Sequence, residues 1–246
     1  GLGGVREPFW RDIKNVDGKP LDIATVLSPD LLHSVISMWM DHPAKWTINS
    51  VGEHEVDIRV RSDPHRSGER SFFKGISSLT QWTGRQTRDL QKKWVAMISG
   101  AVHEKTGNAM PTLVEENRAL MDYIYMAHYP AHTTKTLADM NNTIRKWHEG
   151  KEVFQTTGGR VDEKGVPINH FNIIKLHIAW HASEHVQEKG SLLGQSTDTP
   201  ERYHPLISKK SFRLTNHRGL YAEQMLRVLD RQERMDMMCV YMDWRQ

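Results

Sequence analysis

A stretch in the middle of the chain reads Leu137-Ala138-Asp139-Met140-Asn141-Asn142-Thr143-Ile144-Arg145-Lys146-Trp147. Its large apolar residues recur three or four positions apart, and polar residues fill most of the positions between them. An α-helix has 3.6 residues per turn, so this spacing places the apolar side chains on one face. The stretch therefore predicts an amphipathic helix that covers a core and ends near Gly150 or continues to Phe154.

The same periodicity predicts helices on both sides of this stretch. Leu90, Trp94, Met97 and Ala101 share one face of a helix that we expect to begin at Thr83. Further helices are predicted over about 112–128, with Thr112 and Glu115 as a capping box, over 172–189, where Gly190 stops the helix, and over about 220–238.

The first predicted helix begins at Ser28-Pro29-Asp30. Serine is a favoured N-cap, proline suits the first helical position, and an acid at Asp30 complements the positive end of the helix dipole. Pro43 then lacks a backbone N–H, so we expect it to break or kink this helix.

Two segments predict a minor β element. Residues 54–61 alternate, with Val56, Ile58 and Val60 on one side and charged residues on the other, which is typical of a half-buried strand. Residues 191–197 form a shorter strand-like piece. The polar loop over 62–70 is the predicted internal boundary. The fold class that follows is mainly α with a minor β element.

Composition limits the classes of function. The chain of 246 residues carries a net charge of +3, which is compatible with nucleic-acid binding but does not require it. The single cysteine, Cys239, excludes a disulfide framework and a cysteine-based zinc site, and it favours a reducing compartment. No run of eighteen apolar residues occurs, so we expect no membrane span. Gly1 in place of an initiator methionine suggests that the sequence either belongs to a longer one or has a misassigned start.

Several short polar-aromatic blocks keep one order along the chain. They are Pro8-Phe9-Trp10, Ser28-Pro29-Asp30-Leu31-Leu32-His33, Gln81-Trp82-Thr83-Gly84-Arg85, Asn172-Ile173-Ile174-Lys175-Leu176-His177, Thr199-Pro200-Glu201-Arg202-Tyr203-His204, Leu214-Thr215-Asn216-His217 and Gln224-Met225-Leu226-Arg227-Val228-Leu229-Asp230-Arg231-Gln232-Glu233. In this order they resemble the C-terminal half of the Plavaka-type DNA transposases of fungal mobile elements. These transposases are relatives of the CACTA elements and have a DDE nuclease core. The resemblance extends from about Pro8 to Arg234.

The resemblance implies a division of the chain. Residues 1–70 would be a partial segment of an RNase H-like core, residues 71–190 a helical insertion, and residues 191–246 the closing segment with the C-terminal helix. It also implies DNA as partner, self-association, and the nucleus as compartment, with the cytoplasm as alternative. Neither a membrane nor a small-molecule substrate is implied.

The resemblance also implies a metal-binding carboxylate at Glu201, in the place of the third acid of the DDE triad. Two Mg²⁺ ions held by such acids clamp the attacking and leaving oxygens of a phosphodiester. Pro200 stands where the family usually has threonine, and Asp198 is a second acid nearby, so either acid could be the ligand. The alternative reading is a first-turn acid that stabilises the helix dipole.

Asp30 and His33 are the second candidate pair. Their i, i+3 spacing places both on one helix face, where they could bind one ligand or each other. They resemble the acid-x-x-His motif that follows the second catalytic Asp in this superfamily, and in another alignment Asp30 is that Asp itself. A helix-start acid beside a packed histidine is an equally good interpretation.

Three histidines, His177, His181 and His185, share a stripe at i, i+4 and i+8. Zinc needs a third ligand and an organised second shell as well as such a pair, and a His-Glu-x-x-His motif is absent, because Ala182 follows His181. We therefore expect a partly buried polar stripe and regard zinc as unfavoured.

Two basic stripes are candidates for contact with DNA phosphates, which require spaced cations. Arg85, Arg88 and Lys92 have only Asp89 nearby in sequence and form the better candidate; Arg213 and Arg218 are further candidates. The second stripe is Arg227, Arg231 and Arg234. There, Glu223 and Asp230 stand four residues before arginines, so a solvated face of ion pairs is the favoured interpretation.

A DDE nuclease needs three carboxylates, and the family's first Asp would lie upstream of Gly1. We therefore expect no nuclease activity from this chain alone, and Mg²⁺ binding only with a complete core. The leading hypothesis is a transposase segment that binds DNA without sequence preference. The alternative is a helical interaction or assembly module derived from a transposase.

Overall fold

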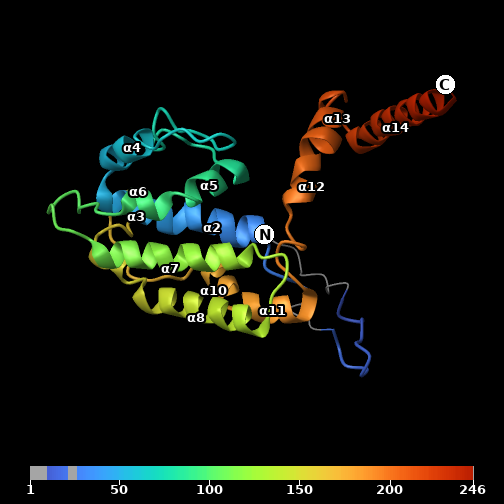
Figure 1. Cartoon of the computed structure of the whole chain (residues 1–246). Coiled ribbons are helices and arrows are strands. Elements are labelled where there is room, and N and C mark those ends of the chain that lie inside the picture. The colour runs from blue at the N-terminus through green and yellow to red at the C-terminus, as the bar shows by residue number, and fades with distance from the viewer. Residues whose placement is uncertain (1–9, 22–26, 246) are drawn as a thin grey trace. The chain divides into compact units, whose positions relative to one another are not determined.

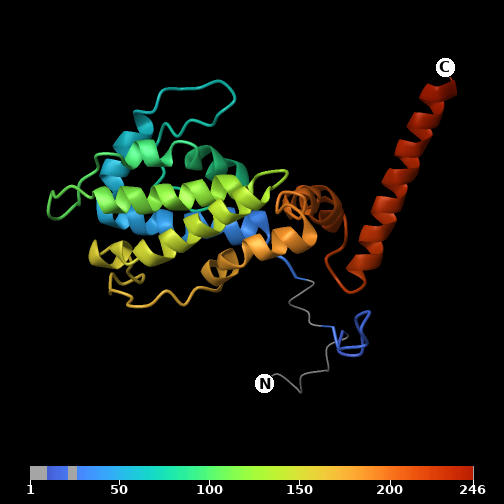
Figure 2. The ribbon, with the colours of Figure 1, turned by 60° about the horizontal axis from the view of Figure 1, so that its bottom comes forward.

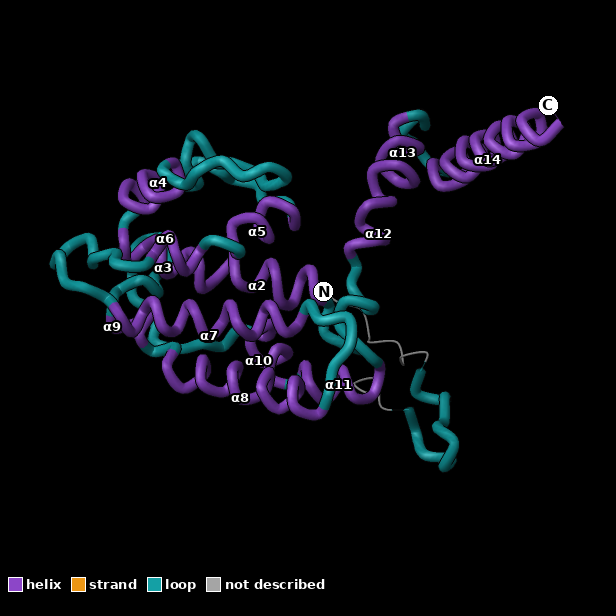
Figure 3. The backbone as a smooth tube through the Cα atoms, viewed as in Figure 1, coloured by secondary structure: helices purple, strands orange, loops and turns teal. Residues whose placement is uncertain are grey.

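The computed structural model describes residues 10–21 and 27–245. Over these ranges the chain is helical, which confirms the mainly α class (Figure 3). The described residues form no sheet, and their β structure consists of isolated bridges that pair Lys14 with Pro20, Val102 with Ala109, and Val161 with Pro167. Of the helices in the described part, none combines the length and apolarity that crossing a bilayer requires.

The chain divides into two compact units, Gly1–Ser196 and Thr197–Gln246. The boundaries expected at 70/71 and 190/191 both fall inside the first unit. In chain order this unit contains η1 (Leu31–Ile36), α2 (Ser37–Trp39), η2 (Met40–Ala44), α3 (Lys45–Val51), α4 (Glu53–Arg61), α5 (Gly84–Gln91), α6 (Trp94–Ile98), α7 (Pro111–Ala127), α8 (Thr134–Gly150), α9 (Val153–Thr156), α10 (Ile174–Trp180) and α11 (Ala182–Lys189). The second unit contains α12 (Asp198–Tyr203), η3 (His204–Lys210), α13 (Ser211–Arg213) and α14 (Tyr221–Arg245).

The first unit is organised around α7 and α8, which lie side by side (Figures 1 and 2). The periodic face of α8 is buried as its spacing predicts, through Leu137, Met140, Ile144 and Trp147. The apolar side of the η1–α2 segment is buried in the same core, and Trp39 meets Trp94 of α6 edge to face, with ring centroids 5.3 Å apart. Burial of these large side chains is the main stabilising term of the unit.

The strand predicted over 54–61 is wrong, because these residues form α4. Val56 and Val60 alternate with polar residues, but they are also four positions apart, which suits a helix equally well. Both are buried, whereas Ile58, which a strand would bury with them, leaves 40% of its surface exposed. Gly52, with a φ of 94°, ends α3 and lets the chain turn into α4. The strand-like piece over 191–197 is likewise wrong, since the chain there forms turns that lead into α12.

The first helix begins two residues later than predicted. Asp30, and not Ser28, is the N-cap, and its carboxylate accepts hydrogen bonds from the backbone of Leu32 and His33. Pro43 does not end the helical path, because η2 is a π-helical turn that leads directly into α3. A wider turn accommodates a residue that has no N–H to donate.

Four further predicted helices differ from the observed ones. The Thr112–Glu115 capping box is absent: α7 has Pro111 at its first position and no side-chain cap. Capping boxes occur instead at Thr83 with Gln86 and at Thr133 with Thr136. The helices predicted over 83–101 and 172–189 are each interrupted, giving the pairs α5–α6 and α10–α11. The last helix extends beyond the predicted 238, since α14 ends at Arg245.

Candidate nucleic-acid interface and predicted metal ligands

Asp30 and His33 bind each other. The His33 Nδ1 lies 2.5 Å from the Asp30 Oδ2, and the same oxygen accepts the backbone N–H of His33 at 2.8 Å. The Asp30 Oδ1 accepts the N–H of Leu32 at 3.3 Å. Both carboxylate oxygens therefore accept backbone N–H groups at the start of η1. This geometry agrees with the interpretation of a helix-start acid beside a histidine.

Glu201 lies in the first turn of α12, where its backbone N–H donates to the Thr197 carbonyl at 2.9 Å. Its Oε2 is 3.1 Å from the His204 Nδ1, and the side chain is 42% exposed. Asp198 occupies the same turn. Glu201 and Asp30 belong to different compact units, so the pairing of these two acids remains a prediction.

The predicted Mg²⁺ ligands do not form a metal site by themselves. Among the described residues, no group of three or more His, Cys, Asp or Glu side chains could hold a metal ion. Asp30 already caps a helix and contacts His33, three residues away. Glu201 likewise contacts His204, three residues away. This donor set does not fit a two-metal centre, which needs several converging carboxylates.

The histidine stripe is divided by a helix junction. His181 ends α10, and its Nδ1 lies 3.0 Å from the Glu184 Oε2. The His185 Nδ1 lies 3.0 Å from the Lys189 Nζ. The His177 and His181 rings are close, with ring centroids 4.9 Å apart, and the His185 N–H donates to the His181 carbonyl at 3.2 Å. Each of the last two histidines thus has a local partner, as expected for a partly buried polar stripe.

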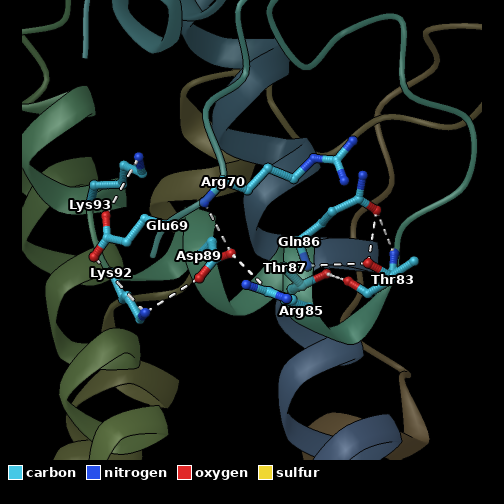
Figure 4. A network of polar contacts seen from close by, with 9 residues as sticks. All are labelled: Glu69, Arg70, Thr83, Arg85, Gln86, Thr87, Asp89, Lys92 and Lys93. Atoms are coloured by element: carbon cyan, nitrogen blue, oxygen red, sulfur yellow. Dashed lines mark hydrogen bonds and ion pairs between the residues drawn. The ribbon is translucent and has the colours of Figure 1, made fainter. Parts of the chain in front are cut away.

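The basic stripe of α5 surrounds one buried acid (Figure 4). The Asp89 carboxylate is only 6% exposed and lies 4.0 Å from the Arg85 Nε and 3.3 Å from the Lys92 Nζ. Lys92 also approaches Glu69 at 3.9 Å, an acid of the 62–70 loop that sequence proximity did not indicate. Arg88 completes the predicted stripe on the same helix, close to Gly84. Arg85 and Lys92 are therefore engaged by internal carboxylates, which weakens this stripe as a phosphate contact.

Lys93 is a charged residue that the sequence analysis did not single out. Its side chain is 5% exposed, and its Nζ lies 2.5 Å from the Asp63 Oδ2 and 3.8 Å from the Glu69 Oε2 (Figure 4 shows Lys93 with Glu69). The backbone N–H of Arg70 adds a bond to Asp89 at 3.3 Å. These contacts fasten the 62–70 loop to α5 and α6, so this network has a structural role.

The second unit presents a different basic surface, here called the 202–218 segment. It carries Arg202, Lys209, Lys210, Arg213 and Arg218 and contains no acidic residue. All five side chains are exposed. Among the described residues, no carboxylate lies within 4.0 Å of any of them. The run without acids is visible in the sequence, although only Arg213 and Arg218 were selected from it.

The turn between α13 and α14 positions Arg213 and Arg218. Phe212 stacks on His217, with ring centroids 4.6 Å apart and planes inclined by only 3°. Asn216 and Gln224 exchange two bonds of 3.0 Å, one from each residue, and the N–H of Arg218 donates to the Asn216 Oδ1 at 3.0 Å. Side-chain contacts therefore order a turn that would otherwise be free to vary.

The α14 stripe contains the ion pairs that its spacing predicts. Arg227 lies 3.8 Å from Glu223, and Arg234 lies 3.1 Å from Asp230. Both pairs are largely exposed, so each contributes little stability, and the face is a solvated one. This confirms the intrahelical interpretation for two of the three arginines.

Comparison of the chain with protein-family models, with curated proteins and with solved structures finds no match.

Proposed function

We propose that the chain is the DNA-binding segment of a Plavaka-type transposase, and that the 202–218 segment is its main contact with the DNA backbone. One observation carries the proposal: five exposed cations lie in a run that contains no acid, and no described carboxylate neutralises them. Phosphate contacts depend on such spaced cations and carry no sequence information, so the binding is independent of sequence. The compartment that follows is the nucleus.

The proposal includes no nuclease activity for the chain by itself. The family's chemistry requires an RNase H-like sheet and three converging acids, and the described residues contain neither. In this proposal Glu201 and Asp30 complete a catalytic centre only together with further acids outside this sequence. The helical first unit then has the role of the insertion that accompanies such a core.

Salt titration tests the proposal. Binding of a short random-sequence duplex, followed by fluorescence anisotropy, should weaken linearly in a log–log plot with salt, with a slope of about 0.9 per neutralised phosphate. Replacing Lys209, Lys210, Arg213 and Arg218 by Gln should reduce that slope by about 3 to 4. The matched control replaces Arg227 and Arg234, which already have carboxylate partners, and should leave the slope nearly unchanged. Equal losses in the two variants, or no binding at low salt, would contradict the proposal.

A second candidate function is assembly through α14, and the surface of this helix favours it. None of its residues is buried. Tyr221, Met235 and Met242 leave 50%, 64% and 48% of their surfaces exposed. An apolar helix surface of this kind typically marks an interaction site.

We propose a second copy of α14 as the occupant, aligned in parallel. A seam with alternating steps of four and three residues comprises Tyr221, Met225, Val228, Gln232, Met235, Cys239 and Met242. Arg231 and Asp236 flank this seam on its two sides. In a parallel pair of helices the residues at these two positions face each other across the interface, so Arg231 of one copy would lie beside Asp236 of the second copy. Unlike Arg227 and Arg234, Arg231 has no carboxylate within 4.0 Å among the described residues.

Sedimentation and cysteine cross-linking test this assembly. The chain should sediment as a dimer, and mild oxidation should link it through Cys239, its only cysteine, because seam positions bring Cα atoms to about 6 Å. Met235→Asp should yield a monomer. Leu226→Asp, which changes an exposed residue off the seam, should not. A monomer that forms no disulfide under oxidation would reject the assembly.

A further inference from the structure

A cavity of about 760 Å³ lies in the first unit, beside the end of α8 and along α10. Lys151, His148, Phe171, His177 and Trp180 line it together with neighbouring residues of the 171–181 stretch, and none of the lining residues is acidic. This volume is typical of a site for a small organic ligand. The DNA-binding proposal does not use this cavity.

Lys151 supplies the cavity with a cation, and Glu152 is its carboxylate neighbour at longer range. Its ammonium donates to the His148 carbonyl at 2.9 Å, and it lies 3.3 Å from the His148 Nδ1 and 5.4 Å above the Phe171 ring. Among the described residues, no carboxylate lies within 4.0 Å of it. Burial lowers the pKa of Lys151, because removing the charged ammonium from water costs free energy. A bound anion would offset that cost.

Aromatic side chains form the rest of the wall. Trp180 lines the cavity and is 40% exposed, and the Arg145 guanidinium lies over its ring, 5.9 Å from the ring centroid. The rings of His148 and Trp180 pack edge to face, with their centroids 5.1 Å apart. Burial lowers the pKa of His148 to about 4, and the imidazole is therefore neutral at physiological pH. The cavity thus combines the Lys151 cation with aromatic side chains in its wall.

We propose that this cavity binds a nucleoside monophosphate group, with the base stacked on Trp180 and the phosphate paired with Lys151. Bases of every kind stack on aromatic side chains, and an ammonium is a common phosphate ligand. The same chemical group occurs in a free nucleotide and at the 5′-phosphorylated end of a DNA strand. Because the cavity lies wholly in the first unit, the inference does not depend on the 202–218 segment.

The experiment is calorimetric titration of the full chain with dAMP, deoxyadenosine and inorganic phosphate. We expect dAMP to bind more tightly than either fragment. Lys151→Met and Trp180→Leu should each weaken dAMP binding by about tenfold or more, equivalent to ~1.4 kcal/mol. Lys135→Met is the matched control, because Lys135 is an exposed cation at the other end of α8, paired with Asp139 at 3.1 Å. Circular dichroism checks that each variant folds.

A second arm distinguishes the two sources of the ligand. A 5′-phosphorylated single-stranded oligonucleotide is titrated into the variant whose 202–218 cations are replaced by Gln, with and without Lys151→Met. Lys151-dependent binding of dAMP, of the oligonucleotide or of both supports the cavity and identifies the source. The inference is overturned if neither ligand binds, if binding does not depend on Lys151, or if inorganic phosphate binds as tightly as dAMP.

Discussion

The Glu116 carboxylate of α7 occupies the space that a side chain on Gly150 of α8 would fill. Glu116 is only 6% exposed although it is an acid, and its Oε2 has no hydrogen-bond partner among the described residues. A side chain at Gly150 would therefore require the end of the Glu116 side chain to move.

Gly150→Ala should destabilise the chain by about 1 to 2 kcal/mol. Alanine adds roughly 1 kcal/mol of helix propensity, but overlap with the buried Glu116 typically costs 1 to 3 kcal/mol or more, so the steric effect should win. Urea unfolding measures the change. In a Glu116→Ala background the same substitution should become neutral or stabilising, and an equal cost in both backgrounds would refute the proposed overlap.

Stability should depend on pH through Glu116. Burial raises the pKa of this carboxyl from 4.5 to about 7. Between these values the folded chain keeps a proton that the unfolded chain has lost, so stability falls as pH rises from about 4.5 to 7. The loss is up to about 3 kcal/mol, and Glu116→Gln should remove that part of the pH dependence. Unfolding curves of both proteins at several pH values measure it; parallel pH profiles would contradict the assignment.

Of the adjacent residues Lys92 and Lys93, Lys93 should contribute more to the free energy of unfolding. It is 5% exposed and bound to Asp63, whereas Lys92 is 48% exposed. Lys93→Met leaves a largely buried carboxylate without its partner, which we expect to cost about 2 to 3 kcal/mol. Lys92→Met should cost less than about 1 kcal/mol, as is usual for an exposed pair. Chemical denaturation of the two variants compares them, and equal costs would show that the Lys93–Asp63 contact contributes little.

The two predicted catalytic acids should differ in their structural roles. Asp30→Ala removes the N-cap of η1 and should cost about 1 kcal/mol. Glu201→Gln changes a 42% exposed side chain and should alter stability by no more than about 0.5 kcal/mol. Thermal unfolding of both variants measures the difference. A large loss for Glu201→Gln would indicate a structural role and count against a catalytic one.

Periodic faces were predictable from the sequence because they depend on local geometry. Met140, Ile144 and Trp147 follow one helical period and are buried together, as predicted. The 54–61 segment was mispredicted for a local reason too: its valines satisfy the periods of both a strand and a helix. The exposure of Ile58, which a strand would bury with the valines, decides between the two.

The candidate sites were less accessible to sequence reasoning, since their partners are distant in the chain. The α5 stripe reads as a basic surface, and only the folded chain brings Glu69 to Lys92 and Asp63 to Lys93. The cavity beside Lys151 likewise forms from a helix end and a segment about twenty residues later. By contrast, the 202–218 segment needs no partner to be recognised, because the absence of acids is a property of the sequence.

The sequence by itself determined the helical class, the buried face of α8 and the ion pairs along α14, because helix geometry relates residues three or four positions apart. The tertiary structure decided which cations are neutralised, which acid caps a helix and where a cavity opens. Those properties depend on Coulombic and packing contacts between segments far apart in the chain. Local periodicity carries no information about such contacts.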